Sequence, residues 1–293
     1  MGINPGGVMD TVAARLVNIL IGNPEPEAVI EIHFPAGEIL FESDAVFALG
    51  GAGFAAELDG ERVLNWRPQF AAKGSVLRFK AKTLGNRAYL SVSGGFKLEK
   101  WLGSASTNPF AKMGGFRGRR LEKGDRLHLN SNHAAAPHDR SVSWSLIPRY
   151  SRFPTVRIIP GAEFESLSAA GRDTFFNEDF VISANSDRMG FRLQGSPVLP
   201  AKKMEIVSSA VNFGTIQLLP DGRLIVLMAD HQTSGGYPRI AHVAAIDLPL
   251  MAQLGANDKV AFHPIAPAEA EDLLAEFERN LTLFKTGCEL LMR

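Results

Sequence analysis

The sequence predicts a mainly β protein made of many short strands and few helices, the pattern of barrels and sandwiches. Apolar and polar residues alternate in short segments, as in AYLSV at 88–92. A short apolar run at 224–228 lies between Asp and Gly residues that end strands. The Asp-Gly dipeptides at 59–60 and 221–222 are typical of tight hairpin turns.

Two helices are expected at the ends of this pattern. The first begins after Asp10, a good N-cap residue, and ends at Gly22 and Pro24. The second follows Pro267, runs through 268–284, and has an acidic first turn that suits the helix dipole. One broad face of the first helix is apolar and consists of Val12, Ala13, Leu16, Val17, Ile19 and Leu20.

A weak internal repeat favours two related β domains. GNRAYLSVSGG at 85–95 is similar to DGRLIVLMADHQTSGG at 221–236: each has a turn, a basic residue, a strand and a glycine pair. The spacing of the segments that follow differs, so duplication is a hypothesis. The stretch Asn130–Arg140, rich in Asn, His, Ala and Pro, is the best linker candidate.

Composition excludes several classes of protein. The chain has 293 residues, 45% of them hydrophobic, and its 31 basic and 31 acidic residues give a formal charge of zero. It therefore lacks the excess of Lys and Arg that nucleic-acid and anionic-membrane binding require, so neither partner is expected. The single Cys288 cannot form an internal disulfide and lies in an apolar stretch, so a small buried residue is expected. With no signal peptide recognisable, we expect a cytoplasmic protein.

The densest polar segment is MADHQTSGGYP at 228–238, which leaves an apolar strand and enters a glycine pair. Its side chains would lie on a loop fixed by strands at both ends, a usual place for function. Asp230 could be a general base or metal ligand, and Gln232 and Thr233 could bind a polar substrate. Gly235 and Gly236 would allow positive φ and close approach of a ligand. The alternative is a tight loop whose side chains cap its own backbone.

A second candidate is ANSDRMG at 184–190. Arg188 offers a planar fork for a carboxylate or phosphate, or it pairs with Asp187 or another acid in a turn. No nucleotide-binding glycine motif and no metal-binding histidine spacing is present, so no metal site is predicted. Lys112 lies in an Ala-Lys-Met tripeptide but lacks the first methionine of a biotin-attachment site, so no covalently bound biotin is expected.

Together these segments resemble the family of 5-oxoprolinase C subunits, also named allophanate hydrolase subunit 2 or KipA. The matching blocks occur in the family's order and cover nearly the whole chain: GVMD, IGNPE, RAYLSVSGG, LGSAST, GGFRGRRLEKGD, SDRMGFRLQG, GTIQLLPDG and ADHQTSGGYPRIAHV. The resemblance implies two cyclophilin-like β-barrel domains, which we place at 1–135 and at 141–293 with the terminal helix.

The resemblance also implies an activity. A family member would belong to an ATP-dependent 5-oxoprolinase that opens the lactam 5-oxoproline, and it would act with a KipI-like B partner and with a third, A-type protein. Two alternatives stay open: a non-catalytic KipA-type regulator of a KipI-like kinase inhibitor, and the carboxyltransferase component of a biotin-dependent urea carboxylase-like system. The expected cofactor is ATP with Mg, bound to this chain or to a partner.

The same resemblance assigns roles to residues. Arg188 would clamp the anionic substrate, Asp230 would orient water or a metal-bound phosphate, and Gln232 completes the catalytic set. Substrate binding would fall to Thr233, Gly235, Gly236, Tyr237, Gln217 and Asp10. Asp10 and Asn23 flank the first helix, where helix capping is the alternative role. Family members usually carry a strand and a D-x-G-R segment before the GVMD block, so a site residue is expected to be missing from a sequence that starts at Met1.

Overall fold

The predicted mainly β class is confirmed by the computed structural model, which describes residues 2–130, 139–202 and 206–292. The chain forms two compact units that interleave along the sequence. One unit consists of Met1–Met9 and Tyr150–Glu276, and the other of Asp10–Arg149 and Phe277–Arg293. Most of the predicted linker at 130–140 lies outside the described residues, and the predicted domain bounds stay a prediction.

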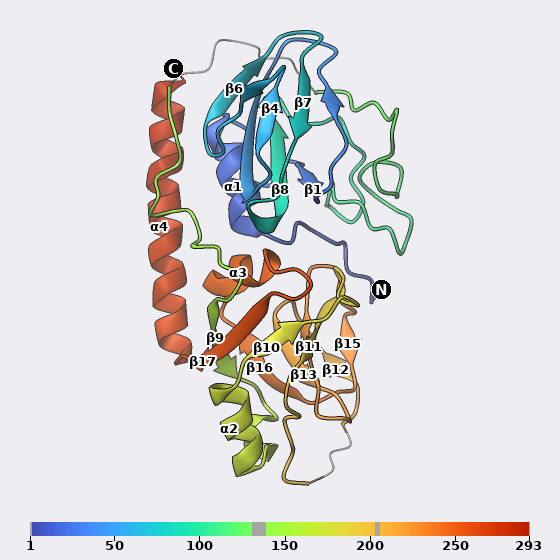
Figure 1. Ribbon diagram of the computed structural model, residues 1–293, viewed down its shortest axis with the longest axis vertical. Helices are drawn as coiled ribbons and strands as arrows, with labels where there is room; N and C mark the ends of the chain where they lie inside the picture. Colours follow the sequence, from blue (N-terminus) through green and yellow to red (C-terminus); the bar gives the residue numbers. More distant parts are fainter. Residues whose placement is uncertain (1, 131–138, 203–205, 293) are drawn as a thin grey trace. The chain divides into compact units, whose positions relative to one another are not determined.

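The unit that contains 150–276 is built on a closed β-barrel (Figure 1). In the described residues its strands follow the order β10-β11-β14-β13-β16-β9-β17, mostly antiparallel, with β17 and β9 parallel. A separate pair, β12 (Ser209–Ala210) and β15 (Ser234–Gly235), lies outside the barrel order. The barrel strands are β9 (Thr155–Pro160), β10 (Phe180–Ile182), β11 (Gly190–Gln194), β13 (Thr215–Leu218), β14 (Leu224–Leu227), β16 (Arg239–Val243) and β17 (Lys259–Pro264).

Strand alternation fills the barrel interior. Along β11, Phe191 and Leu193 are buried while Arg192 between them is exposed, as the period of two requires. Helix α2 (Ala169–Asn177) supplies Phe175, whose ring stacks on Phe262 at 5.1 Å between centroids. The short helices η1 (Phe164–Ser166), η2 (Ala245–Asp247) and α3 (Leu248–Ala252) complete this unit.

The other unit holds two four-stranded sheets in the described residues, with the orders β1-β8-β3-β6 and β2-β7-β4-β5. One closed barrel is thus present in the described residues where two were expected, and the cyclophilin likeness stays a prediction. The strands are β1 (Ile30–Ile32), β2 (Ile39–Leu40), β3 (Ala45–Gly53), β4 (Ala56–Leu58), β5 (Glu61–Arg62), β6 (Pro68–Ala71), β7 (Val76–Phe79) and β8 (Leu84–Val92).

Helix α1 (Thr11–Leu20) confirms the first predicted helix. The Asp10 carboxylate accepts a hydrogen bond from the Ala13 amide at 2.9 Å, which caps the helix, and Gly22 has a φ of +82° just beyond its end. The helix packs on β3, where a Cβ at Gly50 would lie 2.6 Å from Val17 Cγ1. Only glycine permits so close an approach of helix and sheet.

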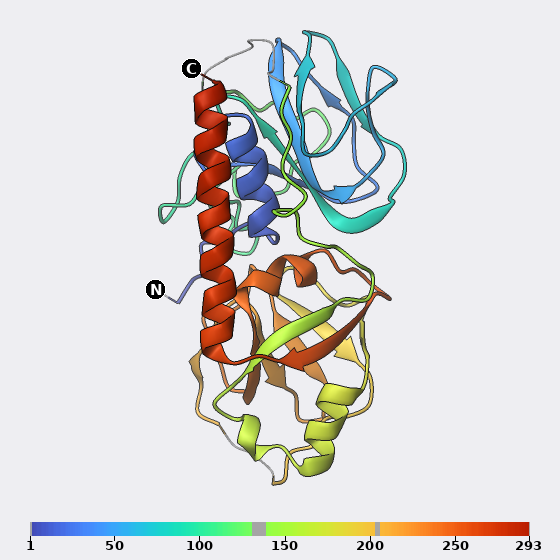
Figure 2. The ribbon, with the colours of Figure 1, turned by 90° about the vertical axis from the view of Figure 1, so that its left-hand side faces the viewer.

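The second predicted helix is α4 (Pro267–Leu291), and its residues from Phe277 onward belong to the unit that contains α1. Figure 2 shows this part of α4 beside α1. Arg15 of α1 joins the two helices by contacting Glu278 of α4 at 2.6 Å, and it also contacts Glu25, beyond the end of α1, at 2.8 Å. Cys288 is buried as expected, and burial raises the pKa of its thiol. None of the described helices is both long and apolar enough to span a bilayer.

Both predicted Asp-Gly turns join antiparallel neighbours. Residues 59–60 connect β4 to β5, with a φ of +52° at Asp59 and +93° at Gly60. Residues 221–222 lie between β13 and β14, with a φ of +82° at Gly222. These turns form because their residues tolerate the left-handed region.

Candidate functional site

The two segments that the sequence singles out lie side by side at one end of the barrel. The turn that carries Arg188 leads into β11, and the loop that carries Asp230 leaves β14. These strands are antiparallel neighbours, with Gly190 opposite Leu227. Backbone bonds extend the pairing into both loops, from the Met228 amide to the Met189 carbonyl at 3.0 Å and from the Asp230 amide to the Arg188 carbonyl at 2.8 Å.

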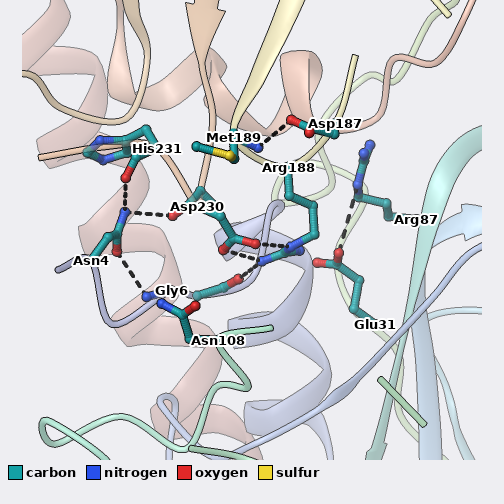
Figure 3. Close-up of polar contacts among 12 residues, drawn as sticks. Asn4, Gly6, Glu31, Arg87, Asn108, Asp187, Arg188, Met189, Asp230 and His231 are labelled. Atoms are coloured by element: carbon teal, nitrogen blue, oxygen red, sulfur yellow. Dashed lines mark hydrogen bonds and ion pairs between the residues drawn. The ribbon is translucent and has the colours of Figure 1, made fainter. Parts of the chain in front are cut away.

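Arg188 and Asp230 form a bidentate ion pair (Figure 3). The Arg188 Nε atom donates to Asp230 Oδ2 at 2.8 Å, and Nη2 donates to Oδ1 at 3.0 Å. The side chains are 24% and 16% exposed, so solvent screens the pair only partly. Of the two alternatives for Arg188, the structure therefore has the ion pair with an acid, and the acid is Asp230. Asp187 instead accepts from the backbone amide of Met189 at 2.8 Å.

The segment before Met9 is tied to this ion pair and its loop. Asn4 Nδ2 donates to the carbonyls of Ala229 at 2.9 Å and His231 at 3.2 Å (Figure 3). The Gly7 carbonyl accepts a short hydrogen bond from Arg188 Nη2. The segment thus fixes the backbone on both sides of Asp230, although some 220 residues separate it from that loop along the chain.

The rest of the loop is held by one local contact and by contacts with two other segments. The Thr233 hydroxyl donates to the Gly2 carbonyl at 2.9 Å, and His231 Nδ1 lies 2.6 Å from the Gln232 carbonyl oxygen. Residues Ser234 and Gly235 pair with β12. The His231 contact fits the alternative of a loop whose side chains cap its own backbone, whereas the Thr233 contact and the pairing with β12 come from segments outside the loop.

The expectation that Gly235 and Gly236 adopt positive φ is wrong, because neither is among the glycines with that conformation. Gly235 is needed for another reason. A Cβ at that position would lie 2.6 Å from Gln217 Nε2, and Gln217 is only 1% exposed. The sequence predicted that a ligand would approach the backbone at Gly235 closely, and in the structure the Gln217 side chain lies there.

Three predicted residues line one pocket of about 360 Å³ on the outer surface of the barrel: Gln217, Gln232 and Tyr237. Gln217 reaches it from β13, and the other two from the loop. The volume suits a small polar molecule. The remaining lining residues are Arg192, Leu219, Pro220, Asp221, Arg223 and Ile225.

Among the lining residues that were not predicted, Arg192 is a cation with no acidic partner in the part of the chain that the structure describes. It points outward from β11 and lies opposite Ile225 of β14, which in turn lies opposite Gln217 of β13. Its guanidinium makes no hydrogen bond or ion pair with any residue that the structure describes. The signal for it was the alternation in Phe191-Arg192-Leu193, which predicts an outward basic side chain on a strand.

Arg223 and Asp221 form an ion pair at the pocket wall, with Arg223 Nε donating to Asp221 Oδ2 at 2.6 Å. This hydrogen bond lowers the pKa of the Asp221 carboxyl and raises the pKa of Arg223. The pair is nearly neutral as a unit, so Arg192 supplies the uncompensated positive charge of the pocket.

Asp10, the last predicted substrate-binding residue, belongs to the other unit and is fully buried. Besides capping α1, it donates its backbone amide to the Tyr89 hydroxyl at 2.8 Å. That hydroxyl donates to Glu31 at 2.9 Å, and burial keeps the pKa of Tyr89 far above its usual value. Asn23 likewise bonds to β8, through the Val92 carbonyl at 2.8 Å. The capping alternative is present for Asp10, and its substrate-binding role stays a prediction.

No group of three or more His, Cys, Asp or Glu side chains in the described ranges could hold a metal ion. Apart from the Asp221 carboxylate, which is paired with Arg223, the polar side chains that line the pocket carry guanidinium, amide and phenol groups. These are donors suited to carboxylate and amide oxygens.

Comparison with known proteins gives consistent matches over most of the chain. A family model described as "Carboxyltransferase domain, subdomain A and B" matches residues 1–264. The chain is 35% identical to the C subunit of 5-oxoprolinase from Haemophilus influenzae over 273 residues, which cover 93% of this chain and 86% of that protein. It is also 35% identical to the C subunit of 5-oxoprolinase from Escherichia coli over 270 residues, 92% of this chain and 85% of that one.

Solved structures give the same fold. The urea carboxylase of Kluyveromyces lactis superposes with a TM-score of 0.91 at 27% identity, covering 98% of this chain and 27% of that one. The urea amidolyase of K. lactis gives a TM-score of 0.91 at 27% identity over 97% of this chain. The chain thus spans only 18% of the urea amidolyase chain and corresponds to one part of that larger protein.

Proposed function

The chain belongs to the family of carboxyltransferase domains with subdomains A and B, and from this premise we propose that it is the C subunit of an ATP-dependent 5-oxoprolinase. The observation that carries the proposal is the likeness to two bacterial 5-oxoprolinase C subunits over most of both chains. The name of those relatives implies further subunits. We propose that this chain acts with a KipI-like B partner and with an A-type partner.

The pocket on the barrel supports a small anionic amide as substrate. 5-Oxoproline carries one carboxylate and one lactam group. Arg192 offers a free guanidinium for the carboxylate, because no described side chain neutralises it. The amides of Gln217 and Gln232 can donate to the lactam oxygen and accept from the lactam N–H. Tyr237, which is 43% exposed, would close the pocket over the ring.

We assign Arg188 and Asp230 a positioning role. Both oxygens of Asp230 already accept from Arg188, so the carboxylate is poorly placed to take a proton from water. The ion pair holds the start of the 230–237 loop against β11. Gln232 and Tyr237 lie on that loop, so losing the pair would misplace two lining residues without touching substrate.

The donor set of the pocket fits the small substrate better than a nucleotide with its metal. Asp221, the carboxylate in the lining, is engaged by Arg223. We therefore propose that ATP, with Mg, is held by a partner protein in the assembled enzyme. When bound there, ATP supplies the phosphoryl group that activates the lactam carbonyl toward water. The residues of this chain bind the substrate and orient its ring.

The test is to co-express the chain with its A-type and B-type partners and to measure ADP release that depends on 5-oxoproline. Arg192→Gln should raise KM at least tenfold, because an ionic hydrogen bond to the carboxylate is lost. Asp230→Ala should lower kcat more than it raises KM. Lys202→Gln, an exposed cation outside the pocket, is the matched control. Turnover that is unchanged in Arg192→Gln and Asp230→Ala would refute the site.

A second candidate is carboxyl transfer from biotin carried by another protein, favoured by the likeness to urea carboxylase over nearly the whole chain. The two activities differ in what they need. Carboxyl transfer would require bicarbonate and would be blocked by avidin, which sequesters biotin. Hydrolysis of 5-oxoproline would proceed without bicarbonate and in the presence of avidin.

A further inference from the structure

A second, smaller cavity of about 190 Å³ adjoins the substrate pocket on the same unit. The two cavities share a wall made by Arg192, Leu219 and Arg223. The smaller cavity lies over β11 and the start of β14, where the strand that carries Arg192 also presents Gln194 outward. Its other lining residues are Ser183, Asn185, Leu193 and Leu224.

The polar lining of this cavity consists of groups that donate hydrogen bonds. Its lining residues carry two guanidinium groups, two side-chain amides and one hydroxyl, and the Ser183 hydroxyl accepts from the Asn185 backbone amide at 3.3 Å. None of the lining residues that the structure describes carries a carboxylate. Such a set disfavours a cation, and it matches an oxyanion that accepts from several directions.

The two arginines of the smaller cavity, Arg192 and Arg223, differ in whether an acidic side chain pairs with them. Arg223 is fixed by its Nε bond to Asp221, which lines the larger pocket but not the smaller one. Arg192 is exposed, and its guanidinium makes no contact of this kind within the described chain. Arg223 lines both cavities and Asp221 only the larger one, and because their pair is nearly neutral, Arg192 adds the uncompensated positive charge.

We propose that the smaller cavity is a binding subsite for a phosphate-class oxyanion, with Arg192 as the shared clamp between it and the substrate pocket. The cavity has room for one such ion and a few waters, since a water takes up about 30 Å³. Gln194 and Asn185 donate to the outer oxygens, Arg192 offsets the charge, and Arg223 adds hydrogen-bond donors. The proposal goes beyond the proposed function because it concerns a second ligand, and the isolated chain alone can test it.

The probe is inorganic phosphate, titrated into the full-length chain by calorimetry at constant ionic strength, with chloride as the reference anion. Saturable binding is expected. Arg192→Gln should weaken it at least tenfold, and Arg192→Lys should weaken it less because the charge remains. Gln194→Leu, which lines only the smaller cavity, should weaken it several-fold. Both residues are exposed, so the variants should keep the melting temperature of the parent chain.

Gln232→Leu is the matched control, because Gln232 lines only the larger pocket. Phosphate affinity should be unchanged in this variant. The proposal is overturned if phosphate shows no saturable binding, or if Arg192→Gln binds it as the parent does. It is also overturned if Gln232→Leu weakens binding as much as Gln194→Leu, since the ion would then lie in the larger pocket. None of these results depends on turnover of 5-oxoproline.

Discussion

Two arginines four positions apart, Arg188 and Arg192, end in opposite electrostatic situations. Arg188 places two nitrogens on Asp230, whereas the guanidinium of Arg192 meets no acid in the described chain. Residue type and local spacing do not distinguish them, because the partner of Arg188 lies 42 positions away. What separates them is register: β11 directs Arg192 outward over the pocket, and the preceding turn directs Arg188 toward the neighbouring loop.

Gly235 gives a sharp test of the pocket wall at the scale of one residue. Gly235→Ala should lower the free energy of unfolding by about 1 kcal/mol, since the new Cβ forces the buried Gln217 amide to move. Urea denaturation measures this cost. Gly236→Ala is the matched control and should be near neutral, because its Cβ would lie 3.4 Å from Ser208 Oγ.

A double-mutant cycle checks that the contact with Gln217 is the cause. In a Gln217→Ala background the obstructing amide is gone, so Gly235→Ala should cost almost nothing. An equal cost in both backgrounds would mean that the strain at Gly235 has another origin, and the described contact would not set the shape of the wall.

At the scale of elements, the 228–237 loop is ordered by a segment remote in sequence and by its own backbone. Asn4 bonds to the carbonyls of Ala229 and His231, and its Oδ1 accepts from the Gly6 amide at 2.9 Å. One side chain thus satisfies three backbone groups that have no strand partner. Loops that position functional groups need such ties, because their backbone lacks a continuous ladder.

Asn4→Ala should therefore loosen the loop more than it destabilises the barrel. The unfolding free energy should fall by about 1–2 kcal/mol, while amide exchange at 230–233 should accelerate several-fold. Hydrogen-exchange mass spectrometry resolves the two effects. Asn177→Ala, which removes a surface contact with Asp173 on α2, is the control and should leave the loop unchanged. Equal exchange in both variants would show that the loop orders itself.

The attachment of α4 to α1 predicts a pH dependence. The hydrogen bond from Arg15 lowers the pKa of Glu278 below its ordinary value of 4.5. Burial acts to raise the pKa of Glu25, but bonds from Arg15 and Lys285 outweigh it, so this pKa is lowered too. A carboxylate with a depressed folded pKa stabilises the protein fully above the unfolded pKa. That contribution is lost as the pH falls through the folded pKa.

Glu278→Gln should therefore lower the unfolding free energy at pH 7 by about 0.5–1 kcal/mol, the range for partly exposed pairs. The variant and the parent chain should begin to converge below about pH 4.5. They should coincide once the pH is below the lowered pKa of Glu278 in the folded protein, because protonation there removes the same charge from the parent. Urea denaturation from pH 3 to 7 measures both effects. Glu289→Gln on the same helix is the control and should have no effect. A constant difference at all pH values would contradict the assigned pair.

At the scale of the whole molecule, the sequence predicted the structural features that are set by residues adjacent along the chain. The cap at Asp10, both Asp-Gly turns, the two helices and buried Cys288 follow from a few adjacent side chains. Two of the predicted site residues that line the pocket, Gln232 and Tyr237, lie on the polar segment 228–238, whereas Gln217 was expected only from the family resemblance. The sequence left open whether Arg188 pairs with an acid, and it could not identify Asp230 as the partner or Arg192 as a cation left unpaired within the described residues, because both depend on contacts between segments far apart.

The two units interleave along the chain, and residues 2–9 directly precede a helix that belongs to the other unit. Asn4 and Gly2 form hydrogen bonds with the loop after β14, and the Gly7 carbonyl accepts one from Arg188. Met9 shares the hydrophobic core of the barrel and is fully buried there.

Met9 therefore offers a test of chain organisation as a whole. If the segment before α1 is part of the barrel core, Met9→Ala leaves a cavity there and should lower the unfolding free energy by about 2–4 kcal/mol. Met189→Ala is the control, since that side chain is 43% exposed in the same unit and should cost under about 0.5 kcal/mol.

Hydrogen exchange then locates the effect of Met9→Ala in the structure. In Met9→Ala, protection should fall in the barrel strands β11, β13 and β14, whereas β3 and β8 should keep theirs. If only β3 and β8 lost protection, Met9 would belong to the core of the other unit, and the assignment of residues 2–9 to the barrel unit would be contradicted.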